Sequence, residues 1–254
     1  MNKNLIKTRF SKAALSYENA AFKQKLMAED LIGLIDPKLC ANKVYEIGCG
    51  TGFLSELLLK KLDIKTLYIN DISSLMLNYC EDKLLHLKEN IPEIFFIEGD
   101  ATCLSLKQSC DLIVSNAVFQ WFVDFKKALL HIKTNLKQGG TLCFSTFLSG
   151  TCVELESLGL PCIKYLTEQE LLSILEECGF EIDIFELQKQ SLIFENPYKL
   201  LKFFKETGTN SLISHQWTPG ILKRFMREYE AKFKVPNGVS LSWIPCYVKA
   251  RLRN

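Results

Sequence analysis

Short apolar runs alternate along this chain with segments in which apolar residues recur every three or four positions. The runs contain many β-branched and aromatic residues and predict buried strands, whereas the longer spacing predicts helices between them. The predicted strands of the first 150 residues are 44–47, 66–70, 94–97, 111–114 and 141–147. Strands that alternate with helices form a parallel sheet through right-handed crossovers, so we predict an α/β fold.

The flanking segments extend this core. Residues 5–35 carry small residues and few aromatics at helical spacing, which suits either a helix over a cleft or a plain packing helix, and Asp36-Pro37 ends it. After the fifth strand we expect the following elements: an irregular connector (150–166), a helix (167–178), a strand (180–187), a helical insertion (196–235) and a last strand (239–251). The whole predicts a seven-stranded, mostly parallel sheet with helices on both faces.

We therefore expect one domain, 1–254, in three parts. The parts are an N-terminal helical lid (1–36), a cofactor-binding core (42–149) and a partner-facing region (150–254) that contains the helical insertion. The sequence contains no internal repeat and no low-complexity segment, so nothing in it predicts a repeat architecture.

The first strand leads into a turn in which Gly48, Gly50 and Gly52 alternate with other residues, two positions after Glu46. Glycines let the backbone bend sharply and let a ligand lie against bare main chain. The N–H groups at the start of the following helix have no partners within the helix and point towards such a ligand. The turn alone is also compatible with a tight strand-to-helix connection that binds nothing.

Polar residues follow the ends of successive predicted strands. Asp71 lies 19 residues after Gly52, close to the spacing at which an acid meets ribose hydroxyls. Asp100 ends the third strand, where it can accept a hydrogen bond from an adenine amine, and Asn116 ends the fourth. Ligands of such sheets bind beyond the carboxyl ends of the strands, so these residues and Glu46 predict a nucleoside site.

Composition is that of an ordinary globular protein, with 48% hydrophobic and 24% charged residues. The formal net charge of +2 conceals an asymmetry, because residues 187–254 hold 12 Lys and Arg against 4 Asp and Glu. Most of this positive charge falls in the predicted insertion. A basic end indicates an anionic partner or simply a solvated basic surface.

Ten cysteines are scattered with no C-x-x-C pair, and the three histidines lack the spacing of metal ligands, so we expect no metal. The N-terminus has no long apolar run and no stretch of 18 apolar residues occurs, so we expect neither a signal peptide nor contact with a membrane. A reduced, cytoplasmic enzyme fits these features best.

Taken together, the motifs resemble the malonyl-acyl carrier protein O-methyltransferases of biotin synthesis, a branch of the class I S-adenosylmethionine-dependent methyltransferases with their Rossmann-like fold. The resemblance covers nearly the whole chain and rests on these segments: 10–14, 17, 24, 46–52, 71–73, 76, 99–101, 115–121, 144–151 and 200–210. The glycine turn and Asp71 are shared by all class I methyltransferases and indicate only the cofactor. Residues 116–121, 144–151 and 202–210 indicate the branch.

The resemblance implies that S-adenosylmethionine methylates the free carboxylate of a malonyl thioester on acyl carrier protein. The expected cofactor-binding residues are Glu46, Gly48, Cys49, Gly50, Gly52, Asp71, Ile72, Met76, Asp100, Ala101 and Asn116. Tyr17, Gln120 and Trp121 are the expected catalytic residues, because an aromatic face over the sulfonium favours a cation. A carboxylate is already ionised at neutral pH, so the reaction requires no strong base.

The substrate carboxylate is expected to meet a cation, and Arg9, Lys12 and Lys126 are the candidates. Acyl carrier protein is acidic, so the basic insertion is the expected docking face. One departure from the resemblance concerns residues 152–166, which are shorter than in the family and contain no histidine. The sequence leaves the oligomeric state open.

Three alternatives remain at this point. A small-molecule methyltransferase acting on another carboxylic acid or a phenol has the same fold. A nucleic-acid methyltransferase would use the basic end on phosphates, but residues 115–119 lack the proline-containing run of base N-methyltransferases. A binding module without turnover would retain the fold, although the intact glycine turn and the acids count against it.

Overall fold

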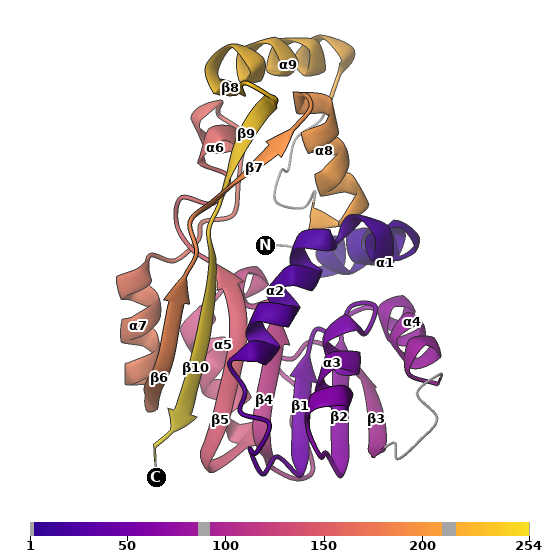
Figure 1. The fold of residues 1–254 in the computed structure, drawn as a ribbon, viewed down its shortest axis with the longest axis vertical. Coiled ribbons are helices and arrows are strands. Elements are labelled where there is room, and N and C mark those ends of the chain that lie inside the picture. Colours follow the sequence, from indigo (N-terminus) through magenta and orange to yellow (C-terminus); the bar gives the residue numbers. More distant parts are fainter. Residues whose placement is uncertain (1–2, 86–91, 210–216, 254) are drawn as a thin grey trace.

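A seven-stranded sheet forms the body of the protein in the computed structural model, which describes residues 3–85, 92–209 and 217–253. Its strand order is β3-β2-β1-β4-β5-β10-β6 (Figure 1). The strands are β1 (Lys43–Ile47), β2 (Thr66–Asp71), β3 (Glu93–Glu98), β4 (Cys110–Asn116), β5 (Leu136–Phe147), β6 (Phe180–Leu187) and β10 (Pro245–Leu252). Strands β1 to β5 pair in parallel and β10 pairs antiparallel with β5 and β6, which confirms the predicted sheet.

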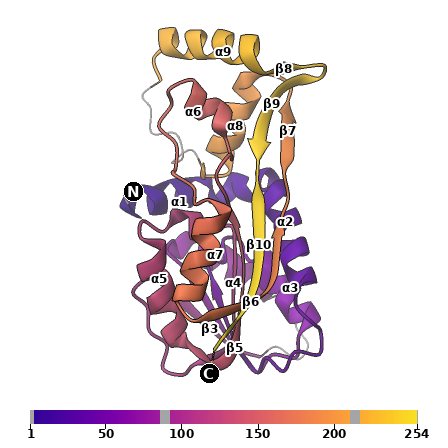
Figure 2. The same cartoon turned by 90° about the vertical axis from the view of Figure 1, so that its left-hand side faces the viewer.

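Helices cover both faces of this sheet. Helices α2 (Phe22–Gly33) and α3 (Phe53–Lys61) lie on one face, with α4 (Ser74–Leu84) packed beside α3; α5 (Phe125–Ile132) and α7 (Glu168–Glu177) lie on the other (Figure 2). Strand alternation divides the core accordingly, because Val44 of β1 packs with one apolar cluster and Tyr45 with the other. No helix in the described parts of the chain is both long and apolar enough to cross a membrane.

The N-terminal segment forms two helices where the sequence predicts one helical region. α1 (Lys3–Ala20) and α2 are separated by Ala21, whose backbone (φ −82°, ψ 34°) is not helical. α1 crosses the carboxyl ends of the strands and packs on α4 and on α8 (Pro197–Glu206) (Figure 1). The helical prediction is confirmed, and the break at Ala21 allows α1 to turn over the strand ends while α2 stays on the face of the sheet.

The second half of the chain builds an upper lobe above the strand ends (Figure 1). Its elements are α6 (Val153–Ser157), β7 (Gln190–Phe194), α8, α9 (Pro219–Phe233), β8 (Lys234–Val235) and β9 (Gly238–Trp243). The antiparallel pair β6 and β10 continues upward as the pair β7 and β9, with Gln190 opposite Trp243. The lobe is therefore an extension of one edge of the main sheet.

Three expectations for the second half need correction. Residues 150–166 contain α6 and are not wholly irregular, since buried Leu155 anchors a short helix. The predicted strand 239–251 is two strands, β9 and β10, which belong to different sheets. β7 was not predicted at all. Both strand errors share a cause, because the apolar pattern of a strand does not reveal which sheet it joins. The helices predicted within 196–235 are confirmed in the described residues.

Candidate active site

The glycine turn brings three elements close together. Gly48 has φ +72°, and a Cβ atom there would stand 2.3 Å from Val118 Cγ2. Gly52 has φ +83°, and its Cβ would stand 2.8 Å from Cys80 Sγ and 3.1 Å from its Cα, so this glycine allows α3 to pack against α4. Gly50 has φ +53° and faces Tyr17 of α1, whose ring lies 3.7 Å from the position of a Cβ. Left-handed backbone of this kind favours glycine.

A cavity, called the main cavity, lies over the carboxyl ends of β1, β2, β3 and β4. Its lining includes these expected site residues: Tyr17, Gly48, Gly50, Asp71, Ile72, Met76, Asp100, Ala101, Asn116 and Trp121. The main cavity is also lined by residues that were not among the expected site residues: Ile6, Phe10, Ile47, Asn70, Gly99, Ala117, Val118 and Phe122. Asp71 and Asp100, predicted at separate strand ends, thus lie around one cavity.

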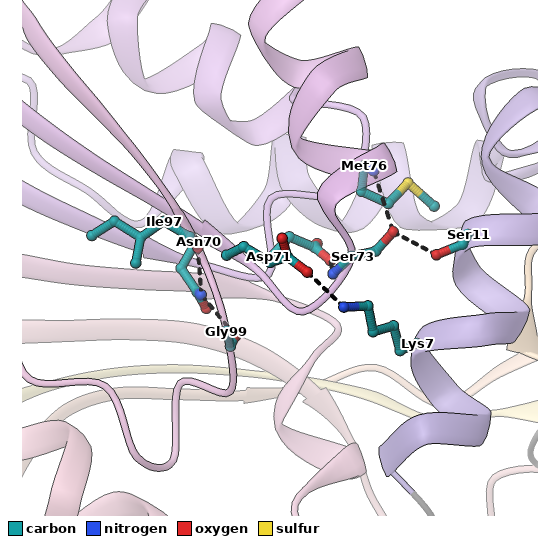
Figure 3. Close-up of polar contacts among 9 residues, drawn as sticks. Lys7, Ser11, Asn70, Asp71, Ser73, Met76, Ile97 and Gly99 are labelled. Atoms are coloured by element: carbon teal, nitrogen blue, oxygen red, sulfur yellow. Dashed lines mark hydrogen bonds and ion pairs between the residues drawn. The ribbon is translucent and has the colours of Figure 1, made fainter.

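Asp71 is held at the rim of the main cavity by backbone donors (Figure 3). Its Oδ2 accepts a hydrogen bond from Gly50 N (3.0 Å), and its Oδ1 accepts one from Ser73 N (2.9 Å). Ser73 in turn caps α4 by accepting from Met76 N (3.3 Å). Burial raises the pKa of Asp71 to about 6, although the backbone hydrogen bonds oppose the shift.

Asn70, next to Asp71, stabilises the carboxyl ends of β2 and β3. Its Nδ2 donates to the carbonyl oxygens of Ile97 and Gly99, each at 2.9 Å, and so ties the end of β3 to β2 (Figure 3). Lys7 of α1 donates to Glu98 Oε1 (2.5 Å) at the end of β3. The sequence does contain a signal for Asn70, since a polar residue within an apolar strand, next to Asp71, is unusual unless its amide has partners.

Asn116 also lies at the main cavity, but both ends of its amide are engaged by the protein. Its Nδ2 donates to the carbonyl of Gln24 (2.9 Å), and its Oδ1 accepts from Ser145 Oγ (2.6 Å). Asn116 therefore links α2 to the ends of β4 and β5. Its side chain positions the wall of the cavity.

A second cavity, the turn cavity, lies on the other side of the glycine turn and is lined by Glu46, Cys49, Thr51 and Gln24, among others. Glu46 Oε2 accepts from Ser55 Oγ (2.5 Å), whereas its Oε1 is buried with no hydrogen-bond partner among the described residues. Burial, with a smaller contribution from the charge of Asp71, raises the pKa of Glu46 to about 7. An unpaired buried carboxylate oxygen is a strong attractor for a cationic guest.

Glu18 fastens α1 to the glycine turn. Its Oε2 accepts from Thr51 Oγ1 (2.7 Å), and its Oε1 accepts from the ammonium groups of Lys25 and Lys83, both at 2.9 Å. Burial opposes ionisation, but the hydrogen bonds from Thr51, Lys83 and Lys25 outweigh it and lower the pKa of Glu18 to about 2. One ionised side chain thus joins α1, α2, the glycine turn and α4.

A third cavity, the inner cavity, lies between helices α1 and α2 and the upper lobe. Its lining residues are Phe10, Tyr17, Gln24, Ala117, Gln120, Trp121, Phe147, Tyr165, Thr209 and Trp243. Phe10 packs edge-on against Trp121, with ring centroids 5.4 Å apart, and these two rings and Tyr17 line both the main and the inner cavity. Tyr17 also lines the turn cavity, so it stands where all three meet.

The remaining expected residues fall in different places. Gln120 lines the inner cavity, where its Nε2 donates to the carbonyl of Ala117 (2.6 Å). Gly52 lines none of the three cavities. The three candidate cations, Arg9, Lys12 and Lys126, also line none of them, and Lys126 is paired with Glu177 Oε2 (2.6 Å).

Comparison with known proteins fits this geometry. The family model described as "Methyltransferase domain" matches residues 45–144, which span β1 to β5. A malonyl-(acyl-carrier protein) O-methyltransferase of Chlorobium phaeovibrioides is 32% identical over 99% of this chain and 97% of its own. Another, from Calditerrivibrio nitroreducens, is 35% identical over 95% of this chain and 94% of its own. The chain belongs to this O-methyltransferase family. The resemblance inferred from the sequence is thereby confirmed.

Solved structures agree on the fold. The YcgJ protein of Bacillus subtilis aligns with 89% of this chain and 99% of its own at a TM-score of 0.62 and 14% identity. The magnesium protoporphyrin IX methyltransferase of Synechocystis, crystallised with S-adenosylhomocysteine, aligns with 90% of this chain and 82% of its own at a TM-score of 0.56 and 17% identity. At these identities the similarity concerns the fold alone: this chain has the class I methyltransferase fold.

Proposed function

We propose that this protein is an S-adenosylmethionine-dependent methyltransferase that methylates the free carboxylate of a malonyl thioester carried by acyl carrier protein, an early step of biotin synthesis. The observation that carries this proposal is the junction at Tyr17, where a cavity lined by Asp71 and Asp100 adjoins an inner cavity without charged side chains among the described residues. The full-length similarity to relatives named for this reaction supports it.

The residues around the main and turn cavities fit the cofactor. Gly48 and Gly50 leave the space in which a ligand can lie against main chain. Asp71 would accept hydrogen bonds from ribose hydroxyls, Asp100 would accept one from the adenine amine, and the unpaired Glu46 Oε1 would meet the ammonium group of the methionine end. When bound, S-adenosylmethionine supplies an electrophilic methyl group that a carboxylate oxygen takes by displacement.

The protein's part in the reaction is alignment and exclusion of water. Burial and the negative charge of Asp71 raise the pKa of Tyr17, so its phenol stays neutral and serves as a donor and an aromatic surface, not as a base. Tyr17 and Trp121 would face the sulfonium, and α1 would cover it. Alignment of reactants contributes as much as ~7–11 kcal/mol to a barrier when the geometry is good.

The proposal includes a docking surface for the carrier protein. The basic residues of the insertion are all exposed on α8, α9 and β8: Lys199, Lys202, Lys205, Lys223, Arg224, Arg227, Lys232 and Lys234. This surface lies on the same lobe that closes the inner cavity (Figure 1). An acidic carrier is attracted to such a surface, and exposed charges of this kind act mainly on the association rate and its salt dependence.

Charge reversal tests the docking surface. The double variant Lys223→Glu/Arg227→Glu is expected to raise KM for malonyl-acyl carrier protein several-fold at low salt and to leave KM for malonyl-coenzyme A unchanged. Lys60→Glu, on α3 of the main body, is the matched control. Equal effects on both thioesters would place the docking site elsewhere.

The cellular setting is also part of the proposal. The ten cysteines are free, and most are buried among apolar residues, where a thiol behaves as a small hydrophobe. Burial raises the pKa of the Cys143 thiol to about 12, so this group stays protonated and unreactive. We place the protein in a reducing, cytoplasmic compartment on this basis.

A methyl-transfer assay tests the proposed function directly. Labelled S-adenosylmethionine is offered with malonyl-acyl carrier protein, malonyl-coenzyme A, free malonate or a short RNA. We expect a methyl ester on the malonyl thioesters, formed faster on the carrier protein. Cofactor binding without methylation of either thioester would contradict the substrate and would favour a different small acid or phenol.

A further inference from the structure

The inner cavity contains polar groups but no cationic ones. Among the residues that the structure describes, no Lys, Arg or His lines it. Two of its polar side chains bond within the protein: Gln120 donates to the Ala117 carbonyl and accepts from Thr146 Oγ1 (3.3 Å), and Thr209 shares a hydrogen bond with Thr207 (2.6 Å). Two other polar side chains in the same cavity wall are exceptions, because each has an atom without a hydrogen-bond partner.

The exceptions are Gln24 and Trp243. Gln24 is 6% exposed and Trp243 is 2% exposed, yet Gln24 Oε1 and Trp243 Nε1 have no hydrogen-bond partner in the described part of the chain. Buried polar atoms are nearly always paired, because an unpaired one keeps its full desolvation cost. Two residues with such atoms, one on α2 and one on β9, line the same cavity, and this indicates a guest that supplies the missing partners.

The donors available identify the chemistry of that guest. The indole N–H of Trp243 can only donate. Rotation of the Gln24 amide exchanges its oxygen and its NH₂ group, so this side chain can present donors as well. A carboxylate accepts several hydrogen bonds at once and is the group that the proposed reaction must hold beside the methyl donor.

We propose that the inner cavity is the carboxylate subsite and that Trp243 and Gln24 hold the substrate's carboxylate there through neutral donors, in place of the lysine or arginine expected from the sequence. This inference rests on the proposed function for the identity of the substrate. The contact at Trp243 also connects substrate binding to the upper lobe, because β9 belongs to the small sheet β7-β9-β8.

Neutral donors suit the reaction better than a cation. Methylation turns a carboxylate into an uncharged ester, so the negative charge on the reacting group fades towards the transition state. A lysine or arginine would stabilise the fully charged ground state more than the transition state and would slow the step. Hydrogen bonds from an indole and an amide orient the carboxylate with a weaker preference for its charged form.

The position of the subsite agrees with this role. The inner and main cavities share Phe10, Tyr17, Ala117 and Trp121, and the inner and turn cavities share Tyr17 and Gln24. A carboxylate bound to Gln24 and Trp243 therefore lies next to the junction at Tyr17. That junction is where the proposed cofactor would place its methyl group.

The first test is kinetic. In Trp243→Phe we expect KM for malonyl-acyl carrier protein to rise about tenfold or more, the loss of one charge-assisted hydrogen bond, while KM for S-adenosylmethionine stays within about twofold. Acetyl-acyl carrier protein, which lacks the carboxylate, should inhibit the variant as well as it inhibits the native protein. An unchanged KM for the malonyl substrate, or equal weakening of both acyl groups, would overturn the inference.

One further variant and two controls sharpen this result. Gln24→Glu keeps the size of the side chain but places a second carboxylate beside the substrate's, so its effect on KM should exceed that of Trp243→Phe. Gln138→Glu, at an exposed position of β5, and Trp217→Phe, which lines none of the three cavities, are the matched controls. Thermal unfolding of each variant separates a local loss of binding from a loss of the fold.

The second test does not depend on turnover. The indole N–H resonance of Trp243, assigned by its absence in Trp243→Phe, should move downfield when malonate is added to protein loaded with S-adenosylhomocysteine. Malonamide, of similar size but neutral, should move it less. If the chemical shift of this resonance does not change with malonate while S-adenosylhomocysteine binds normally, the subsite is contradicted, whatever the methyl-transfer assay shows. Failure of that assay with a positive malonate shift would instead contradict the proposed thioester substrate.

Discussion

The main and inner cavities share Tyr17 and Trp121, yet among the described residues only the main cavity is lined by charged side chains. Around the glycine turn and the strand ends, carboxylates stand beside the amides, and burial raises the pKa of Asp71 and Glu46. In the inner cavity the groups without partners are an amide and an indole. In the proposed function, one side would bind hydroxyls and a cation, and the other would bind an anion.

The rings between the two cavities keep these environments apart. Phe10, Tyr17 and Trp121 line both sides, so the carboxylates of the main cavity and a carboxylate in the inner cavity are separated by apolar surface. Like charges repel strongly where water is excluded, so a substrate carboxylate would be unstable beside Asp71. In the proposed function, the two reactants would thus be held in separate cavities according to their charge.

The largest expected effect comes from adding a side chain at Gly48, which lines the main cavity. Gly48→Ala would place a methyl group 2.3 Å from Val118 Cγ2 on left-handed backbone. Left-handed strain (~1–2 kcal/mol) and overpacking (~1–3 kcal/mol) together should lower the free energy of unfolding by about 2–5 kcal/mol and abolish S-adenosylhomocysteine binding. Urea unfolding and calorimetric titration measure both. Gly220→Ala in α9, where a Cβ meets nothing within 4 Å, should be neutral or stabilising.

Removing the acid at the end of β2 should weaken binding in the main cavity and leave binding in the inner cavity nearly unchanged. Asp71→Ala is expected to weaken cofactor binding at least tenfold, about 1.4 kcal/mol, because ribose hydroxyls lose their acceptor. KM for the malonyl substrate should change little, since Asp71 does not line the inner cavity. Asp183→Ala, an exposed acid paired with Arg251, is the control. An unchanged dissociation constant would remove Asp71 from the site.

The pH dependence of cofactor binding tests the turn cavity. The folded pKa of Glu46 is raised from 4.5 to about 7, so at pH 6 most of the free protein carries a protonated Glu46. A cationic guest favours the ionised form, so affinity should rise by up to about tenfold per pH unit between pH 5.5 and 7, where an α-amino group is still protonated. Asp71, with a pKa of about 6, adds to the lower part of this rise. Isothermal titration should show proton release, and Glu46→Gln should flatten the upper part of the profile.

The smallest effect is expected at the lid. Glu18→Gln keeps the hydrogen bond from Thr51 but loses the charge that attracts Lys25 and Lys83. These groups are partly exposed and screened, so cofactor affinity should fall only about two- to five-fold, in line with ion pairs of ~0.2–1 kcal/mol. Hydrogen exchange of α1 should quicken in parallel. Weaker binding with unaltered exchange would place the effect of Glu18 at the glycine turn and not at the lid.

The core and the cofactor side could be predicted from the sequence because their signals are local. Acids at or near the ends of strands, Glu46, Asp71 and Asp100, need only the rule that parallel strands end at one edge. The prediction also placed Tyr17 and Trp121 at the site, through resemblance. It included Gly52, which serves packing against Cys80, and Asn116, whose amide is taken up within the protein. Sequence motifs do not separate a glycine that faces a ligand from one that faces a helix.

The inner cavity could not be predicted because it depends on contacts between distant residues. Gln24 and Trp243 are separated by most of the chain and meet only because β9 continues β10 into the upper lobe. Trp243 alone is typical of a core residue, and nothing near it in sequence marks its N–H as unpaired. A cationic side chain was expected because the substrate is negatively charged, whereas the residues of the cavity wall are brought together by the topology of the last strands.

The most direct measurement of this account is a crystal structure of the protein with S-adenosylhomocysteine and a malonyl-pantetheine analogue. We expect the nucleoside over Asp71 and Asp100, the sulfur beside Tyr17, and the malonyl carboxylate within hydrogen-bond distance of Trp243 Nε1 and the Gln24 amide. A carboxylate bound instead to Arg9, Lys12 or another cation, with the inner cavity filled by water, would contradict the separation of charge between the two cavities.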